Sequence, residues 1–212
     1  MTTVRTVVAA IALLVLPVAA GAEIIDRILA VVGGELIMLS DATLARRLAL
    51  VPAPASDRDG TRTALDALIE RQLELIEVNR YLPPEPAEAT IQSRLAAIRS
   101  RFASDDELDR VLTQYGYTRE QLRLRLRDDL RIEGYLSQRF DAAAQPSDEE
   151  VLEYYRAHEG DFTRDGAPRP YAEVRDEVKA RLLRERREAA MRDWIAGLRR
   201  RVEISDLYLS GK

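Results

Sequence analysis

Apolar side chains recur every three or four residues over most of residues 61–198, which is the spacing of one face of an α-helix. The first long stripe stops before Pro83, because proline cannot continue a helix. Further stripes cover residues 87–102, 108–112, 122–140, 151–155 and 174–198. We therefore expect a mainly α-helical protein. The first stripe is made by Leu65, Leu68, Ile69, Leu73 and Ile76.

Polar residues mark the starts of several of these helices. A hydroxyl or carboxylate side chain followed three residues later by an acid or amide is the signature of a capped N-terminus. Ser40-Asp41 predicts a helix that continues to about Leu50. The other start signals are Ser104 with Glu107, Thr118 with Gln121, and Pro146-Ser147 with Glu150.

The two ends of the segment 24–209 follow the strand period instead. Residues 24–39, IIDRILAVVGGELIML, form two short apolar runs around Gly33-Gly34, a pair typical of a two-residue hairpin turn. A helix broken by the glycines is the alternative. Near the other end, Val202 and Ile204 alternate with polar neighbours. Because an isolated hairpin is marginal in water, we expect the last strand to pair with the first hairpin. This pairing makes the last helix part of the N-terminal core.

The segment 163–170, TRDGAPRP, interrupts the helical pattern between two charged helices. Its glycine, aspartate and prolines are turn residues, so locally it predicts a loop.

The first 22 residues have the layout of a secretory signal peptide. MTTVR carries one positive charge, an apolar run follows, and small residues precede a cleavage site between Ala22 and Glu23. The alternative is an uncleaved anchor, although the run is short and contains Pro17. We expect residues 23–212 to be a single exported domain without a further membrane segment.

Composition excludes several chemistries. The chain has no cysteine and one histidine, which removes disulfides, thiolate metal sites and thiol nucleophiles. His158 has no triad partners and fits a solvated helix end. Gly33-Gly34 lacks the further residues of a phosphate loop. We therefore expect no catalytic residue, no metal and no cofactor.

Arginine-rich stretches at 123–131 and 181–201 are interrupted by acids at helical spacing. That pattern is typical of a solvated helix face, and the net charge of −4 gives no global attraction for nucleic acid.

The order of these parts resembles the SurA family of exported chaperones and prolyl isomerases. IIDRILAVVGGELIMLSDA is similar to the opening of that family, and TRTALDALIERQLELIEVNRY to its next helix. YGYTREQLRLRLRDDLRIEGYL and SDEEVLEYYRAHEGDF resemble the segments that lead up to the parvulin isomerase domain. The chain from Tyr171, YAEVRDEV onward, resembles the helix and strand that return after it.

The resemblance implies a multi-helix chaperone core that binds unfolded polypeptides in the periplasm, notably outer-membrane protein precursors. A parvulin domain needs roughly a hundred residues, but only TRDGAPRP separates its flanking helices here. We therefore expect a holdase that is not an enzyme. A prolyl isomerase-like protein and a dedicated adaptor of an export system are the alternatives.

Client binding needs adaptable apolar surface rather than a reactive group. Aromatic residues close to loops are candidates, because tyrosine can both stack on and hydrogen-bond to varied chains. Each could equally close the core between helices. Residues 84–140 could form a helical lobe of their own. The candidate client-binding residues are Tyr81, Tyr115, Tyr117, Tyr154 and Tyr155.

Overall fold

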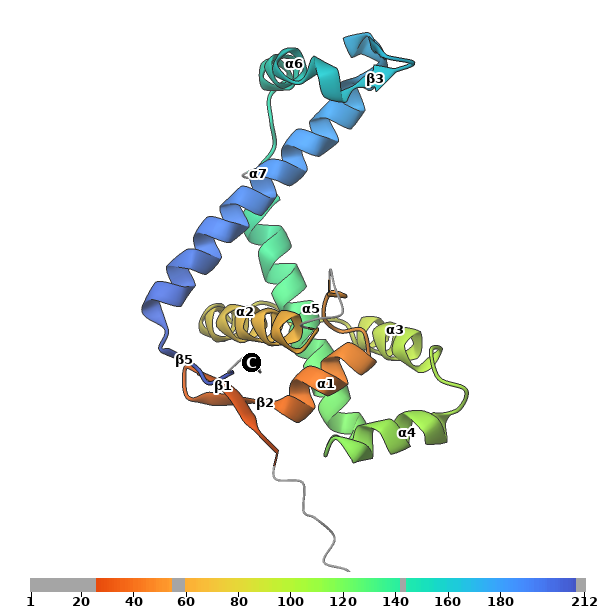
Figure 1. The fold of residues 1–212 in the computed structure, drawn as a ribbon, viewed down its shortest axis with the longest axis vertical. Coiled ribbons are helices and arrows are strands. Elements are labelled where there is room, and N and C mark those ends of the chain that lie inside the picture. Colours follow the sequence, from red (N-terminus) through yellow and green to blue (C-terminus); the bar gives the residue numbers. More distant parts are fainter. Residues whose placement is uncertain (1–25, 55–59, 142–143, 209–212) are drawn as a thin grey trace, which may run out of the picture.

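The computed structural model describes residues 26–54, 60–141 and 144–208, and it is mainly helical, as predicted. A compact lower part holds most elements, and the long helix α7 rises from it to a smaller upper lobe (Figure 1). The helices are α1 (Leu39–Arg47), α2 (Gly60–Tyr81), α3 (Glu88–Arg99), α4 (Asp105–Gln114), α5 (Arg119–Phe140), α6 (Asp148–Ala157) and α7 (Tyr171–Arg201).

A three-stranded antiparallel sheet joins the beginning and the end of the described chain. Strand β1 (Ile28–Val32) lies between β2 (Glu35–Met38) and β5 (Ile204–Asp206). Gly33 and Gly34 form the turn with φ of +58° and +90°, values that favour glycine. The predicted hairpin and its pairing with the C-terminal strand are confirmed, and the alternative of a broken helix is wrong.

The last helix closes the N-terminal core. Leu198 of α7 is buried in the same cluster as Leu29 of β1 and Leu73 of α2, and Trp194 and Ile195 pack against that cluster. Strand β5 follows one turn later, so α7 and β5 together cover the hairpin. The prediction that the last helix belongs to the N-terminal core is confirmed.

Residues 84–140 share their core with α1. Leu44 and Leu48 of α1 are buried with Ile98 of α3, Leu112 of α4 and Leu126 of α5. The second half of α5 joins a different cluster, with α2 and α7. That residues 84–140 form a helical lobe of their own therefore stays a prediction.

The upper lobe has a core of its own, made by α6, the first half of α7 and Phe162, which follows a short 3-10 turn (Glu159–Asp161). Within it, TRDGAPRP forms a small hairpin of β3 (Thr163–Arg164) and β4 (Ala167–Pro168). Asp165 and Gly166 make its turn with φ of +53° and +80°. The prediction of a loop is therefore wrong, since Asp-Gly is a signal for a two-residue hairpin.

The start of α1 differs from the prediction. The helix begins at Leu39, because β2 leads into it without an intervening loop. The Asp41 carboxylate accepts the N–H of Met38 at 2.8 Å, and the N–H of Ser40 donates to Asp26 at 3.1 Å. The helix also ends earlier than expected, at Arg47.

The other start signals are confirmed. Reciprocal capping boxes are present at Thr118 with Gln121 and at Ser147 with Glu150. The Ser104 hydroxyl accepts the N–H of Glu107, whose own carboxylate accepts from Ala103 rather than from Ser104. Over the described part of the chain, no helix is both long and apolar enough to cross a membrane.

Candidate functional site

The five candidate tyrosines lie in three separate places. Tyr81 ends α2 and is 59% exposed, with its ring 5.3 Å from that of Tyr135 on α5. A row of rings continues behind it through Trp194 and Phe140, and Arg139 lies 5.7–5.9 Å from three of these rings. Tyr81 is therefore an exposed side chain with a rigid aromatic base.

Leu82, next to Tyr81, is 75% exposed and has a φ of +48°. Because Pro83 follows, the helical region is disfavoured for Leu82, and the chain leaves α2 in the left-handed region instead. We call Tyr81 and Leu82 the helix-end surface. It presents an aromatic and an aliphatic side chain together to solvent, on a backbone that helix α2 holds in place.

Tyr115 and Tyr117 are half-buried against the cluster formed by α1, α3, α4 and α5. The Tyr117 hydroxyl donates to Oδ1 of Asp41 at 2.8 Å, which ties the start of α5 to α1. Burial, with the adjacent Asp41 carboxylate, raises the pKa of Tyr117 to about 12.

Tyr154 and Tyr155 belong to the upper lobe. Tyr154 donates to Glu185 at 2.7 Å and stacks on His158 with ring centroids 4.1 Å apart. Tyr155 is buried, and its hydroxyl donates to the backbone oxygen of Arg169 at 2.6 Å. His158 caps the end of α6, with Nδ1 2.8 Å from the carbonyl oxygen of Tyr154, at the expected helix end.

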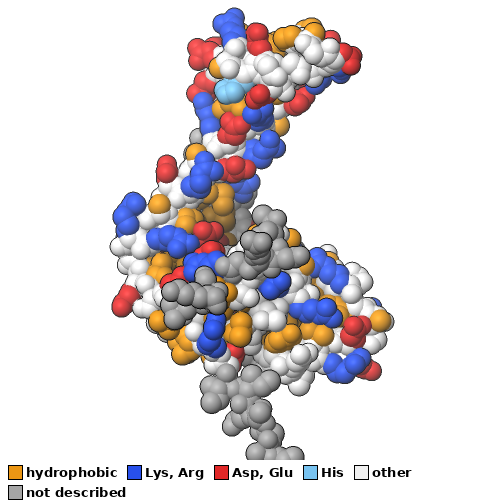
Figure 2. All heavy atoms as spheres, viewed as in Figure 1, with side chains coloured by type: hydrophobic (Ala, Val, Ile, Leu, Met, Phe, Trp, Pro, Cys, Tyr) orange, Lys and Arg blue, Asp and Glu red, His pale blue; other side chains and the backbone are white. Residues whose placement is uncertain are grey.

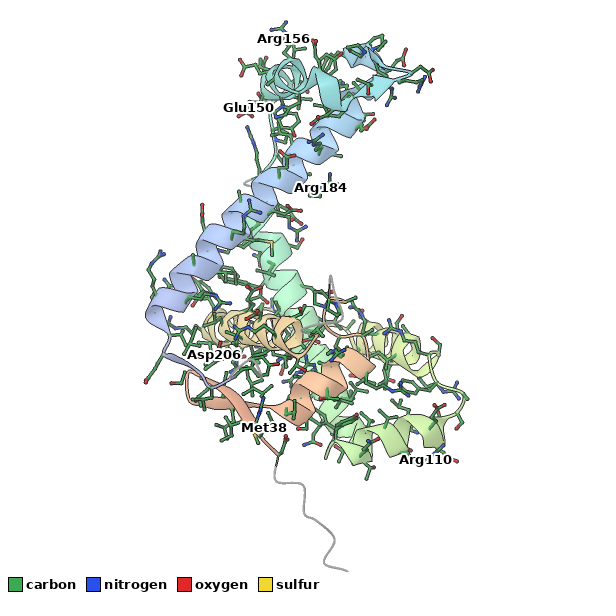
Figure 3. All side chains as sticks on the ribbon, viewed as in Figure 1. Met38, Arg110, Glu150, Arg156, Arg184 and Asp206 are labelled. Atoms are coloured by element: carbon green, nitrogen blue, oxygen red, sulfur yellow. The ribbon has the colours of Figure 1, made fainter. Side chains whose placement is uncertain are left out.

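The sides of the upper lobe are tied to α7 by ion pairs. Glu150, labelled in Figure 3, meets Arg186 at 2.6 Å. The bonds from Arg186 and from the backbone of Ser147 lower the pKa of Glu150 to about 2. On the face drawn in Figure 2, charged side chains cover the upper lobe and apolar ones gather where α7 meets the lower part.

A cavity of about 350 Å³ lies between α2, α3, α5 and the segment after α1. We call it the α2–α5 cavity. Its walls are mainly aliphatic, and charged side chains enter it from three helices. The lining includes Leu50, Val51, Ala67, Arg71, Glu74, Arg94, Ala97, Ile98, Arg101, Arg125, Leu126, Asp129, Ile132, Glu133 and Leu136.

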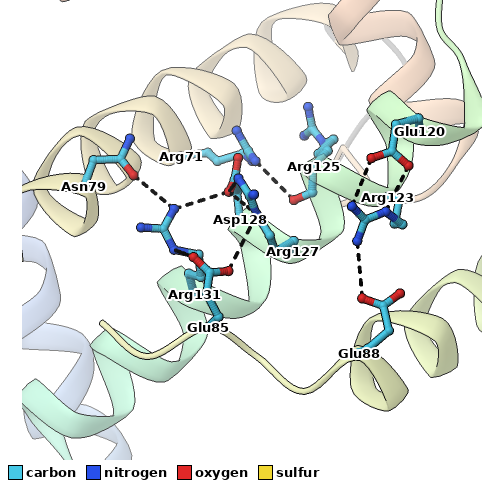
Figure 4. Close-up of polar contacts among 10 residues, drawn as sticks. All are labelled: Arg71, Asn79, Glu85, Glu88, Glu120, Arg123, Arg125, Arg127, Asp128 and Arg131. Atoms are coloured by element: carbon cyan, nitrogen blue, oxygen red, sulfur yellow. Dashed lines mark hydrogen bonds and ion pairs between the residues drawn. The ribbon is translucent and has the colours of Figure 1, made fainter. Parts of the chain in front are cut away.

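Arg131 of α5 is buried and Arg125 is largely buried, contrary to the prediction of a solvated face at 123–131. Arg131 is 7% exposed and donates to Asn79 at 3.0 Å, with Asp128 and Glu85 nearby (Figure 4). The side chain of Arg125 is 12% exposed. The physical reason is that α5 passes between α2 and α3, which cover two of its sides.

The second arginine-rich stretch, on α7, has the predicted solvated character. Arg181 pairs with Glu185 at 3.0 Å and Arg192 with Glu188 at 3.9 Å, both at i,i+4 spacing. Such exposed pairs contribute little stability. Their role is to keep the face solvated.

A second cavity, of about 460 Å³, lies between α2 and α7. Met191, Ile195 and Ala196 supply its apolar wall, and the charged pair of Glu70 with Arg199, 3.3 Å apart, lies beside them. Glu74 lines this cavity as well as the α2–α5 cavity. It makes no hydrogen bond or ion pair with another described residue.

Burial and the neighbouring Glu70 carboxylate together raise the pKa of Glu74 to about 7, against the opposing charge of Arg71. The pKa of this carboxyl in an unfolded chain is 4.5, so ionisation opposes folding. The stability associated with neutral Glu74 is complete below pH 4.5 and is lost as the pH rises through 7.

Replacing Glu74 with glutamine is therefore expected to stabilise the protein at high pH. The gain in the free energy of unfolding at pH 8 should exceed the gain at pH 5 by about 2 kcal/mol, allowing for partial solvent screening. Urea denaturation of both proteins at the two pH values measures it. Glu133→Gln, at an exposed carboxylate paired with Arg94, is the control. Equal gains at both pH values would contradict the raised pKa.

Sequence reasoning proposed Tyr81 as a candidate, which stays a prediction, and it did not identify the two cavities described above. Arg125 in the α2–α5 cavity has an acid, Asp129, at the same i,i+4 spacing that arginines on an exposed helix have. Only the packing of α2 and α3 on α5 separates the two cases. Among the described residues, no group of three or more histidine, aspartate or glutamate side chains is placed to hold a metal ion.

The fold resembles that of a solved chain from a study of two structurally related SurA-like chaperones of Campylobacter jejuni, the virulence factor PEB4 and the periplasmic protein Cj1289. The TM-score is 0.52 and the identity 15%, and the match covers 86% of this chain and 99% of the other. The similarity therefore concerns the fold. No family model matches the sequence, and no curated protein matches it.

Proposed function

We propose that this protein is an exported chaperone that holds unfolded polypeptides and prevents their aggregation. The observation that carries the proposal is the similarity in fold to a SurA-like chaperone over 86% of the chain, with the elements in the order that the sequence motifs predict. The periplasm is the proposed location, and outer-membrane protein precursors are the proposed clients. The signal-peptide prediction, with its cleavage site, falls on residues 1–23, outside the described part of the chain.

The helix-end surface supports this proposal. A holdase must offer apolar contacts to many sequences while it stays soluble itself. Tyr81 and Leu82 present such contacts, and the row of rings behind Tyr81 fixes its position, so little side-chain entropy is lost on binding. We propose this surface as a client contact. Tyr115, Tyr117 and Tyr154 remain weaker proposals, because each also has a structural contact, and Tyr155 is the weakest because it is buried.

We propose further that the protein is not a prolyl isomerase. The two helices that would flank an isomerase domain, α6 and α7, are joined through the short 3-10 turn and the hairpin of β3 and β4. Val151 of α6 and Val174 of α7 are buried in one cluster with Phe162. This compact connection supports holding activity without catalysis.

Binding to an unfolded outer-membrane protein tests the proposal. The purified chain without residues 1–22 is titrated into a fluorescently labelled client diluted from urea, and into the same client after folding in detergent. We expect a complex with the unfolded client and an affinity at least tenfold lower for the folded one. Equal affinities, or no binding, would refute the proposed function.

Two further measurements separate the alternatives. Turnover of a proline peptide well above its uncatalysed rate would show an isomerase. Recovery of one stoichiometric partner, combined with no binding of unfolded clients, would show a dedicated adaptor.

A further inference from the structure

The side chain of Arg125 is largely buried, and its Nε has no hydrogen-bonding partner among the described residues. Its side chain is 12% exposed, its Nε is inaccessible and unsatisfied, and no other described residue accepts a hydrogen bond from it. The carboxylate of Asp129 lies 4.0 Å from this Nε, beyond hydrogen-bonding distance. Burial and the charge of Arg71 lower the pKa of Arg125. An unsatisfied buried charge is costly and calls for a specific explanation.

The neighbouring charges are already engaged. Arg71 binds Asp129. Arg71 also donates to the backbone oxygen of Arg125 at 3.4 Å, as Figure 4 shows. On the opposite side, Asp41 accepts from Tyr117 and from the N–H of Met38, both at 2.8 Å. Arg125 therefore has one long ion pair, with Asp129 at 4.0 Å, and both oxygens of Asp41 already accept other hydrogen bonds.

The other charged side chains of the α2–α5 cavity do not accept a hydrogen bond from Arg125 either. Arg94 pairs with Glu133 at 2.9 Å, and Arg101 donates to the backbone oxygen of Leu48 at 2.8 Å. Glu74 is the remaining carboxyl, and it has no partner of its own among the described residues. The cavity lining thus holds four arginines and three acids. Asp129 pairs with Arg71 and Glu133 pairs with Arg94, and Glu74 is the third acid.

The rest of the cavity is shaped for an apolar group. Its volume of about 350 Å³ lies at the lower end of the range for ligand pockets and exceeds one large side chain. Aliphatic side chains from α2, α3 and α5 line part of it, beside the charged side chains. A group that fits must combine an apolar body with a single anionic end.

We propose that the α2–α5 cavity binds the C-terminal residue of a polypeptide that ends in an apolar side chain, with its free carboxylate on Arg125. The inference rests on the proposed function, because it names the part of a client that this cavity takes. A chain end offers the required chemistry, since its carboxylate and its apolar side chain are carried by the same residue. The planar fork of arginine can donate two parallel hydrogen bonds to a carboxylate.

Calorimetric titration of the purified protein with three short acetylated peptides tests the proposal. The first is alanyl-alanyl-leucine with a free carboxylate, the second is its C-terminal amide, and the third is an amide with an internal aspartate before leucine. We expect the free acid to bind at least ten times more tightly than either amide. Equal binding of the acid and its amide overturns the proposal, and equal binding of the internal aspartate overturns the assignment to a chain end.

Variants of Arg125 separate binding from structure. Arg125→Met should reduce acid binding to the level of the amide, and it removes a largely buried charge whose ion pair with Asp129 is 4.0 Å long. Arg127→Met, on the same helix but paired with Asp128 at 2.7 Å and outside the cavity lining, should leave acid binding unchanged. Retained preference for the acid in Arg125→Met overturns the proposal.

A second variant keeps the test decisive if Arg125→Met is destabilised. Arg125→Lys retains the charge but loses the two-pronged geometry, so it should weaken acid binding severalfold and leave amide binding unchanged. Unchanged acid binding in that variant overturns the proposal. The client titration distinguishes the two proposals: a protein that binds unfolded clients but shows no acid preference refutes only this inference.

Discussion

Replacing Leu198 with alanine is expected to lower the free energy of unfolding by about 3 kcal/mol. Leu198 is 1% exposed and lies in α7, close to the end of the described chain, yet its buried neighbours include residues of β1 and α2. Truncating it removes buried apolar volume and leaves a cavity beneath the sheet. The effect should therefore fall on the core that contains the N-terminal hairpin.

Urea denaturation followed by circular dichroism measures this loss. Leu207→Ala is the matched control, because Leu207 is only nine residues further along and is 52% exposed. It should change stability by less than about 0.5 kcal/mol. A loss below 1 kcal/mol for Leu198→Ala would contradict the closure of the N-terminal core by the last helix.

Replacing both Tyr81 and Leu82 with serine is expected to weaken the hold on unfolded clients about tenfold. The two side chains are 59% and 75% exposed, so a client can cover most of their apolar surface. Losing that contact corresponds to about 1.4 kcal/mol of binding free energy, a modest share of what two such side chains can contribute. The measurement is the affinity for a labelled unfolded outer-membrane protein.

The control for this variant removes two other exposed apolar side chains elsewhere. Leu36 and Leu207 are 53% and 52% exposed at the small sheet, far from the end of α2 in sequence. The double variant Leu36→Ser and Leu207→Ser should bind the client as the unchanged protein does. If both double variants weaken binding equally, general hydrophobicity rather than the helix-end surface accounts for the hold.

The elements of this fold follow closely from local patterns. Gly33-Gly34 between apolar runs specified the first hairpin, and the alternation of Val202 and Ile204 specified the last strand. The long-range pairing of these strands followed from one physical argument, that a lone hairpin is marginal. The boundaries failed where an element had no separating loop, as at Leu39, where β2 becomes α1 directly.

The cavities were beyond sequence reasoning for a different reason. Arg125 and Arg123 belong to the same helix and the same charge pattern. Arg123 pairs with Glu120 at 2.9 Å on the surface, whereas Arg125 turns toward α2 and is buried. The difference depends on the angle at which α2, α3 and α5 pack. The pattern of charges along one helix does not predict that packing angle.

The TRDGAPRP segment has one feature that the local sequence predicts and one that it does not. Its Asp165-Gly166 pair is a local hairpin signal, and the structure places a hairpin there. The sequence does not say what its position between α6 and α7 means, because the expectation that an isomerase domain is absent there came from the family resemblance alone. The proposal that the protein holds clients without catalysis is therefore tested by measurements on the protein itself.

Suppression of aggregation is the most direct test of that central proposal. An unfolded outer-membrane protein is diluted from urea into buffer with increasing amounts of the chain lacking residues 1–22, and light scattering is followed. We predict that scattering is largely suppressed near a stoichiometric ratio. Scattering that is unchanged by a stoichiometric amount of the protein would contradict the assignment as a holding chaperone.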